Sequence, residues 1–361
     1  MDKSNNGNLM KKVLFTILLA ASAVFISVLL HSCSNNAESA MQVPNFEEIC
    51  VIKDNDKVIS DVQSIDIIDE NRFVISDMQS VYLYDIQAAR IKKISHSGRA
   101  QGEYILPMTV RYNNGHIYVW SAGNLSFIVY DLDGNYINGY PYNSAISDFL
   151  VDNRNIYVYT AGKADDYIID VIELPGNKTV ERLINANDEH IFMNKFYSVA
   201  PMASENGKFY FSPKDKLKIY GYNSENGRCD ELLSFESKTF IVEKGINEVQ
   251  YNDANGRRQV LGDNSLTLGL LLKKNNFYLM TLEGKLGENI KYADSGKYFA
   301  IYDCSKPKEP VAKYPYSTIG KARLIDTFNG SFYILSYSTN NEDDFVLNRI
   351  CRLPLFWTAY N

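Results

Sequence analysis

Histidine and cysteine are scarce in this chain, and both are scattered. The 361 residues contain four His and five Cys, with no CxxC pair and no two His at the spacing of metal ligands. Structural zinc sites and redox thiols need such clusters. We therefore expect no metal centre and no cofactor. The acid pairs Asp165–Asp166 and Asp343–Asp344 could offer oxygen ligands to calcium, but neither lies in an EF-hand pattern.

Several signatures of catalysis and of nucleic-acid binding are also missing. The sequence has no P-loop, no dinucleotide fingerprint and no G-x-S-x-G turn. The net formal charge is −6 and no long basic run is present, so a nucleic-acid partner is not expected. Hydrolysis of a glycan by paired carboxylates stays open, because loops of a fold can bring together acids that are distant in sequence.

The N-terminus has the pattern of an export signal. Lys11 and Lys12 precede an apolar run from Val13 to Leu30, and Cys33 follows shortly after it. The ending Leu30-His-Ser-Cys33 resembles a bacterial lipobox, with His31 in place of the usual small residue. The resemblance implies a signal peptide over residues 1–32, lipidation of Cys33, and a tether over residues 33–44. The alternative is an uncleaved membrane anchor, because the apolar run is just long enough to span a bilayer.

A short phrase is repeated six times along the rest of the chain. Each copy has a turn, then an anchor residue that is Phe or Ile, usually a Tyr after it, and alternating apolar residues. The copies are 71–76, 115–120, 154–159, 207–212, 275–280 and 330–335, with the anchors Phe73, Ile117, Ile156, Phe209, Phe277 and Phe332. A strand-based repeat with anchors 39 to 68 residues apart is typical of a β-propeller.

Each copy reads as the second of four strands in one blade. A strand such as 64–69, 108–112 or 324–327 precedes it, a third such as 81–85 or 167–173 follows, and a fourth such as 90–94 comes last. Asn113-Asn-Gly115 and Asn329-Gly330 predict tight hairpins between first and second strands. The sequence therefore predicts an all-β, six-bladed propeller of four-stranded antiparallel blades over residues 45–361.

Blade six shows no fourth strand of its own. Residues 47–52 read as a strand upstream of the first complete blade, so we expect them to supply the missing strand and close the ring. This pairing would bring Cys50 near Cys351, as a disulfide or as two reduced buried thiols. A polar insertion over residues 236–264 separates blades four and five, and such a loop is often functional or disordered.

Residues 94–104 carry a resemblance to a family. They read Ile-Ser-His-Ser-Gly-Arg-Ala-Gln-Gly-Glu-Tyr, in which Gly98, Gly102, Glu103 and Tyr104 match a Gly-x-Gly-Pro-Gly-Glu-Tyr-like connector. With the lipobox and the six repeats, the chain resembles the TolB-like six-bladed β-propeller lipoproteins of Bacteroidota. Gln101 stands where Pro is usual. The resemblance implies a lipid-anchored envelope protein on the periplasmic face of the outer membrane. Surface display is the alternative, although residues 34–38 contain a single acid.

The loops between second and third strands share one face with the connectors between blades. That face collects polar residues, namely Asp77, Arg99, Glu103, Asn124, Lys163, Asp165, Asp166, Asp188, Glu189, His190, Lys214, Asp215, Asp343 and Asp344. We select as ligand-binding candidates Asp77, Arg99, Glu103, Tyr104, Asn124, Asp165 and Lys214. Polar residues also occupy loops simply because loops face water, and residues 98–104 could instead be a stiff connector.

Two functional classes fit these observations. The first is a monomeric, non-catalytic module that binds or scaffolds a protein, peptide or glycan, favoured by the scarcity of His and the absence of catalytic motifs. The second is a propeller lyase or hydrolase acting on a carbohydrate or peptide, with acids and Arg99 or Lys214 near the mouth of the ring. The fold alone does not choose between them.

Overall fold

A computed structural model describes the chain over ten stretches. They are residues 47–52, 62–88, 90–161, 166–194, 199–243, 260, 262–284, 296–315, 321–339 and 346–353. Residues 315, 321–326, 336–339 and 346–349 are described by their backbone alone. The described residues belong to the compact unit Pro44–Asn361, while the other unit is Met1–Val43. The expected signal peptide, Cys33 and the whole tether over residues 33–44 therefore lie outside the described residues.

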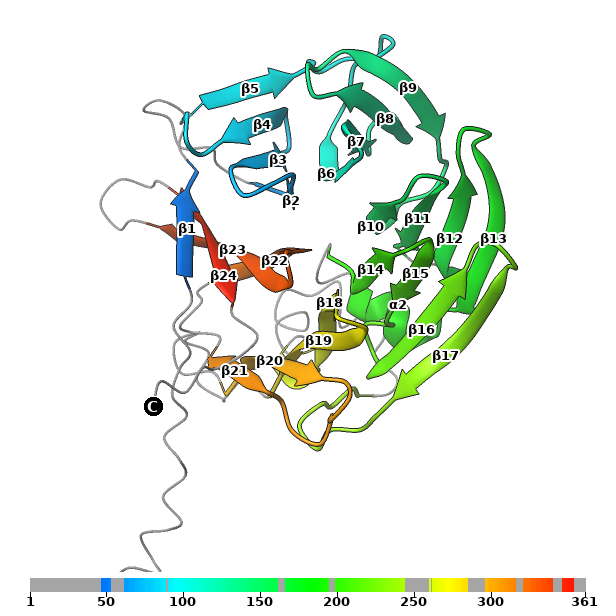
Figure 1. Cartoon of the computed structure of the whole chain (residues 1–361), viewed down its shortest axis with the longest axis vertical. Helices are drawn as coiled ribbons and strands as arrows, with labels where there is room; N and C mark the ends of the chain where they lie inside the picture. The colour runs from blue at the N-terminus through cyan, green and yellow to red at the C-terminus, as the bar shows by residue number, and fades with distance from the viewer. Residues whose placement is uncertain are drawn as a thin grey trace, which may run out of the picture. The chain divides into compact units, whose positions relative to one another are not determined.

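The strands form six antiparallel sheets of four, which are the six blades of the predicted propeller (Figure 1). Blade 1 contains β2 (Ser64–Ile67), β3 (Arg72–Ser76), β4 (Val81–Asp85) and β5 (Arg90–Ile94). Blade 2 contains β6 (Pro107–Asn113), β7 (His116–Ser121), β8 (Ser126–Asp131) and β9 (Tyr136–Pro141). Blade 3 contains β10 (Ile146–Val151), β11 (Asn155–Thr160), β12 (Tyr167–Glu173) and β13 (Lys178–Asn185).

The second half of the chain repeats this arrangement. Blade 4 contains β14 (Met202–Glu205), β15 (Lys208–Phe211), β16 (Lys218–Asn223) and β17 (Arg228–Ser234). Blade 5 contains β18 (Leu266–Lys273), β19 (Asn276–Glu283), β20 (Tyr298–Asp303) and β21 (Ala312–Pro315). Blade 6 contains β22 (Lys321–Phe328), β23 (Ser331–Thr339), β24 (Val346–Leu353) and, at its outer edge, β1 (Glu47–Val51). The prediction of an all-β, six-bladed propeller is confirmed.

The blades close into a ring. The first strands β2, β6, β10, β14, β18 and β22 contact one another in this order, and β22 contacts β2 again. They lie innermost in Figure 1. The buried apolar residues fall into six clusters, and each cluster joins two neighbouring blades. The core is therefore a set of blade interfaces, and the repeat in the sequence is the repeat of these interfaces.

The repeated phrase occupies the second strand of every blade, as predicted. Five of its six anchors are buried, and Phe277 is partly exposed. The stacked rings of Tyr157 and Phe209, with centroids 4.0 Å apart, show how these residues join one blade to the next. The Asn-Gly hairpins have positive φ at both turn residues, 46° and 82° at Asn114 and Gly115. This is the geometry of the turn that best fits the twist of two strands.

The N-terminal strand closes the ring, as expected. β1 pairs antiparallel with β24, and Glu47 forms an ion pair with Arg352 at the start of the pairing. Ile52, which follows β1, is fully buried in the cluster between blades 6 and 1. No disulfide joins Cys50 to Cys351, although the two thiols lie on neighbouring strands, and burial raises the pKa of Cys50 to about 12.

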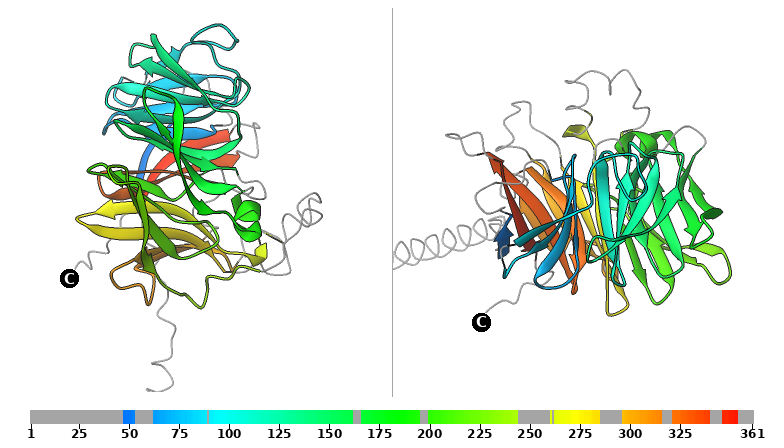
Figure 2. Two further views of the ribbon diagram at one scale, coloured as in Figure 1. Left: turned by 90° about the vertical axis from the view of Figure 1, so that its right-hand side faces the viewer. Right: turned by 90° about the horizontal axis from the view of Figure 1, so that it is seen from above.

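A short helix, α2 (Asp188–Asn194), lies in the connector from blade 3 to blade 4, outside the sheets (Figure 2). Asn187 begins it by accepting a hydrogen bond from the N–H of His190 at 2.9 Å. Its Phe192 and Met193 belong to the apolar cluster of blades 5 and 6. The helix therefore reaches across the ring on the face that holds the blade connectors.

The predicted insertion separates blades 4 and 5, between Ser234 of β17 and Leu266 of β18. Its two ends are held together, because Ser265 N–H donates to Ile241 C=O at 2.7 Å.

Within the described stretches, no helix is long and apolar enough to cross a membrane.

Candidate functional site

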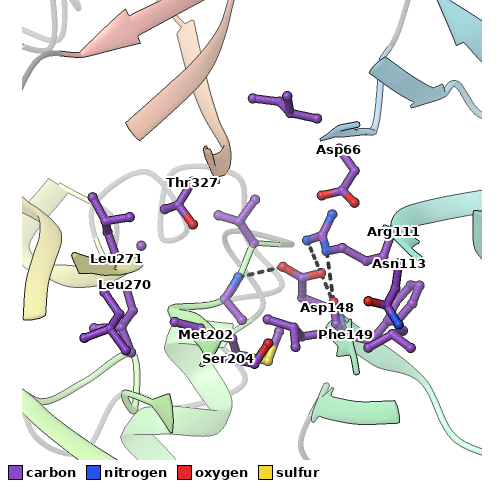
Figure 3. A pocket seen from close by; sticks show the side chains of 18 of the residues that line it. Asp66, Arg111, Asn113, Asp148, Phe149, Met202, Ser204, Leu270, Leu271 and Thr327 are labelled. Atoms are coloured by element: carbon purple, nitrogen blue, oxygen red, sulfur yellow. Dashed lines mark hydrogen bonds and ion pairs between the residues drawn. The ribbon is translucent and has the colours of Figure 1, made fainter. Parts of the chain in front are cut away.

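A cavity of about 370 Å³ lies on the axis of the ring (Figure 3). The innermost strands of all six blades contribute to its wall, with Thr327 from β22, and so does the turn that follows β22. The wall extends to the turns between first and second strands, where Ser204, Glu205 and Asn329 are exposed. On the opposite face, α2 reaches across the ring. The mouth of the cavity therefore lies at the first-to-second-strand turns.

A buried ion pair forms one side of this cavity. Nη2 of Arg111, on β6, donates to Oδ1 of Asp148, on β10, at 2.5 Å, and the Asp148 side chain is only 2% exposed. Oδ2 of Asp148 accepts from Ala200 N–H at 3.0 Å. Burial raises the pKa of the Asp148 carboxyl, and the attraction of Arg111 and these hydrogen bonds opposes the rise. Phe149 N–H also donates to Oδ1, at 2.7 Å, so three donors hold this carboxylate in one position.

On this side of the cavity, polar side chains of one inner strand form hydrogen bonds with the main chain of the inner strand of the next blade. We call this capping. Ser64 Oγ and the Asp66 carboxylate, on β2, accept hydrogen bonds from the N–H groups of Val110 and Tyr112 on β6. Nε of Arg111 donates to the C=O of Phe149 at 2.9 Å. Because the inner strands are sheet edges, their outward N–H and C=O groups need such partners.

Within the described residues, β14 of blade 4 does not cap β18, the next inner strand. β14 places Ala203 and Ser204 at the cavity, and both side chains are short. β18 follows with Gly269–Leu272. In the part of the chain that the structure describes, no hydrogen bond from outside the sheet reaches the main chain of residues 203–205 or 269–272. This side of the cavity therefore combines aliphatic side chains with the open edges of two strands.

A second hollow of about 530 Å³ continues the cavity onto the outer surface. It shares Asn113, Val151, Ser204 and Glu205 with the axial cavity. Beyond them it follows the turns of blades 2 to 4, with the side chains of Asn114, Asp152, Asn153, Arg154, Asn206, Ser224 and Glu225. We call this surface the turn groove. The two hollows together form one site that runs from the axis to the rim.

Acidic groups outnumber basic ones in the axial cavity. Its described lining holds Asp66, Asp148 and Glu205 against the single cation Arg111. Asp148 forms an ion pair with Arg111, whereas the exposed side chain of Glu205 has no hydrogen bond or ion pair within the described residues. The cavity is therefore better suited to a neutral or cationic group than to an anion.

The candidate Lys214 lies beside Asp215 and His190, two further polar residues of the connector face, outside the axial cavity. Nδ1 of His190 lies 3.6 Å from Oδ1 of Asp215, and Lys214 Nζ donates to Ser147 Oγ at 3.0 Å. All three side chains are buried. Burial lowers the pKa of His190, and it lowers that of Lys214 to about 7. These contacts attach α2 to blades 3 and 4.

A third hollow, of about 440 Å³, lies over blade 2 and brings three predicted candidates together. Arg99, Glu103 and Asn124 all line it. The Glu103 carboxylate accepts from Ala100 N–H at 2.8 Å and contacts His96 Nε2 at 2.7 Å, which lowers its pKa, with the Ala100 bond as the main cause. Asn124 Nδ2 donates to the C=O of Glu103 at 3.0 Å. The connector is thus bound to itself through two of these three residues, whereas Arg99 is exposed.

The remaining candidates are divided. Tyr104 is fully buried, and its hydroxyl accepts from Val81 N–H at 3.1 Å. Asp77 closes its own turn by accepting from the N–H groups of Gln79 and Ser80. Asp165 lies outside the described residues, as do Lys163, Asp343 and Asp344. None of the described candidates lines the axial cavity. Among the described residues, no group of three or more His, Cys, Asp or Glu could hold a metal ion.

Sequence reasoning did not select the residues of the axial cavity. Asp66 and Arg111 both stood inside predicted first strands, in Ile65-Asp-Ile67 and Val110-Arg-Tyr112. A charged residue flanked by apolar ones in the innermost strand of a propeller has to face the channel or a neighbouring blade. The signal is present in the sequence, but it lies in strands, whereas the predicted candidates lie in loops and connectors.

Comparison with known proteins supports the fold and assigns no activity. No family model and no curated protein matches the sequence. A candidate exported protein of Bacteroides fragilis is similar in structure, with a TM-score of 0.56 and 14% identity over 88% of this chain and 97% of that one. A DUF4221 family member from Bacteroides vulgatus gives a TM-score of 0.57 and 12% identity over 86% and 97%. At these identities the likeness extends to the fold alone.

Proposed function

We propose that this protein is a non-catalytic binding propeller of the bacterial cell envelope, and that its ligand occupies the axial cavity and the turn groove. The observation that carries the proposal is the continuity of these two hollows. They share four lining residues and together lead from the ring axis to the rim on one face. A concave site with a few fixed polar groups and an apolar wall is the usual form of a binding pocket.

The state of the acids supports binding over catalysis. A general acid or base needs a proton that it can exchange with the substrate. The Asp148 carboxylate is held by Arg111 and two backbone N–H groups, and Asp66 caps the N–H of Tyr112. Both acids therefore have a structural partner already. This favours the binding module over the propeller lyase or hydrolase.

The proposed location rests on the N-terminal sequence and on the similarity in fold to a candidate exported protein. The lipobox-like Leu30-His-Ser-Cys33 supports lipidation of Cys33, with the propeller held at the periplasmic face of the outer membrane. The similar Bacteroides fragilis structure is that of a candidate exported protein, which agrees with this location. Membership of the TolB-like lipoprotein family is part of the same proposal.

A thermal-shift screen of the full chain tests the site. Glycans, short peptides, nucleotides and divalent ions are screened against the wild type and two variants. Ser204→Trp places a large ring at the shared lining of both hollows, whereas Gln79→Trp adds the same ring to an exposed turn on the opposite face. A ligand at 100 times its Kd stabilises the protein by about 2.7 kcal/mol.

The expected result is a ligand that stabilises the wild type and Gln79→Trp but not Ser204→Trp. A ligand that stabilises Ser204→Trp equally well would contradict the proposed site. A hit that is consumed during incubation would instead favour the enzyme.

A further inference from the structure

The uncapped side of the axial cavity consists of strand edges. β14 and β18 are the innermost strands of blades 4 and 5, so each has a partner on one side only. In an antiparallel pair, every second residue directs its N–H and C=O groups away from the partner strand. Along residues 269–272 these groups are directed toward the axis, where the cavity lies.

The difference between the two sides of the cavity has a cause in the sequence. On blades 1 and 2, the inner strand supplies a charged side chain, Asp66 or Arg111, that caps the next inner strand, whereas Asp148 of blade 3 reaches only Ala200, ahead of β14. At the corresponding place β14 has Ala203 and Ser204, which are too short to play this part. The main-chain N–H and C=O groups at the inner edge of β18 therefore have no such side-chain partner among the described residues, and they are open to a ligand in the cavity.

We propose that the ligand of this cavity is an extended peptide segment, which pairs through its main chain with the inner edge of β18. The proposal rests on the function proposed above. An exposed strand edge pairs readily with another extended chain, and main-chain hydrogen bonds then provide the affinity. Residues 269–272 span about 13 Å at 3.3 Å per residue, which is enough for a segment of three or four residues.

The charges of the cavity assign one end of this peptide. The described lining of the cavity holds the three acids Asp66, Asp148 and Glu205 against the single cation Arg111. Glu205 is exposed at the mouth, where the cavity meets the turn groove. A free N-terminal ammonium or a Lys side chain is therefore favoured at the mouth, and the partly exposed Leu150 and Leu272 favour apolar side chains along the rest of the segment.

Calorimetric titration of the full chain with four probes tests this inference. The probes are trivaline amide, its N-acetylated form, its form methylated on the central amide nitrogen, and maltotriose. Trivaline amide should bind. Methylation removes one main-chain donor and should weaken binding about tenfold. Glu205→Gln should weaken trivaline amide about threefold and leave the acetylated form unchanged, because an exposed charge pair contributes little. Glu173→Gln, an exposed acid outside both hollows, is the matched control and should change neither.

The possible failures are distinguishable. Peptide binding that ignores main-chain methylation would overturn strand addition. Binding of maltotriose without any peptide would also overturn it, and if Ser204→Trp blocked the sugar, the proposed function would stand. Absence of binding by every probe at millimolar concentration would overturn the peptide inference as well.

Discussion

Removal of the carboxylate from the buried ion pair should destabilise the propeller strongly. Asp148→Asn keeps the shape of the side chain but replaces one acceptor oxygen by an NH₂ group. The carboxylate now accepts from Arg111 at 2.5 Å, Phe149 N–H at 2.7 Å and Ala200 N–H at 3.0 Å. In the variant, at least one donor would face another donor, and Arg111 would lose the negative charge of Asp148 in a site where its own side chain is 14% exposed.

The size of the effect follows from these contacts. Breaking a buried ion pair by removal of one partner costs about 3–5 kcal/mol. Burial already raises the pKa of Asp148 against the attraction of Arg111, so the pair itself contributes little net stability. Arg111→Met alone leaves a buried carboxylate and should also destabilise. The double variant, which removes both charges, should lose less than the sum of the single losses, by about 2 kcal/mol.

Urea unfolding at pH 7, followed by far-UV circular dichroism, measures the four free energies of unfolding. The urea dependence should be the same for all four proteins, so that the differences report on the native state. A loss below about 1 kcal/mol in Asp148→Asn would refute the reasoning, since it would lie within the range of an exposed ion pair. Strictly additive losses would refute it too, because they would show that the two side chains do not act as a pair.

Three further predictions concern separate parts of the chain. The pKa of Lys214 is lowered to about 7 by burial, so its folded form loses a proton that the unfolded chain keeps up to about pH 10. Stability should therefore rise with pH above 7 by up to about 1.4 kcal/mol per unit relative to Lys214→Met, and parallel pH profiles in urea unfolding would contradict this. Phe209→Ala removes a fully buried ring stacked on Tyr157 and should cost about 3–5 kcal/mol in the same assay, whereas a cost under 1 would show that the interface repacks. Cys33→Ala should abolish lipid attachment and release the protein from the membrane fraction, and an unchanged mature mass would rule out the lipoprotein.

The fold could be predicted because its information is local and repeated. Each blade interface needs an apolar anchor at the same place in the second strand, and the sequence repeats that anchor six times. The Asn-Gly turns specify the hairpins by backbone conformation alone, as the positive φ at Asn114 and Gly115 shows. The closing strand is predictable because blade six has only three strands of its own and residues 47–52 belong to no other blade.

The axial site could not be predicted in the same way. Asp66, Arg111 and Asp148 lie on three different blades, and only ring closure brings them to one cavity. The helix α2 was also unexpected, because its Phe192 and Met193 pack on blades 5 and 6 far along the chain. The helix lies across the connector face, so the mouth of the axial cavity is on the opposite face. The candidates selected from the sequence lie on the connector face instead. Arg99, Glu103 and Asn124 nevertheless line one hollow, and they stay candidates for a second contact surface.

Hydrogen exchange with and without the first ligand from the screen tests the central claim most directly. The method reports the protection of individual main-chain segments, which are the groups that the site exposes. The account predicts ligand-induced protection in residues 203–205 and 269–272, at the open edges of β14 and β18. Protection confined to residues 98–104 and 124, on the opposite face, would contradict it.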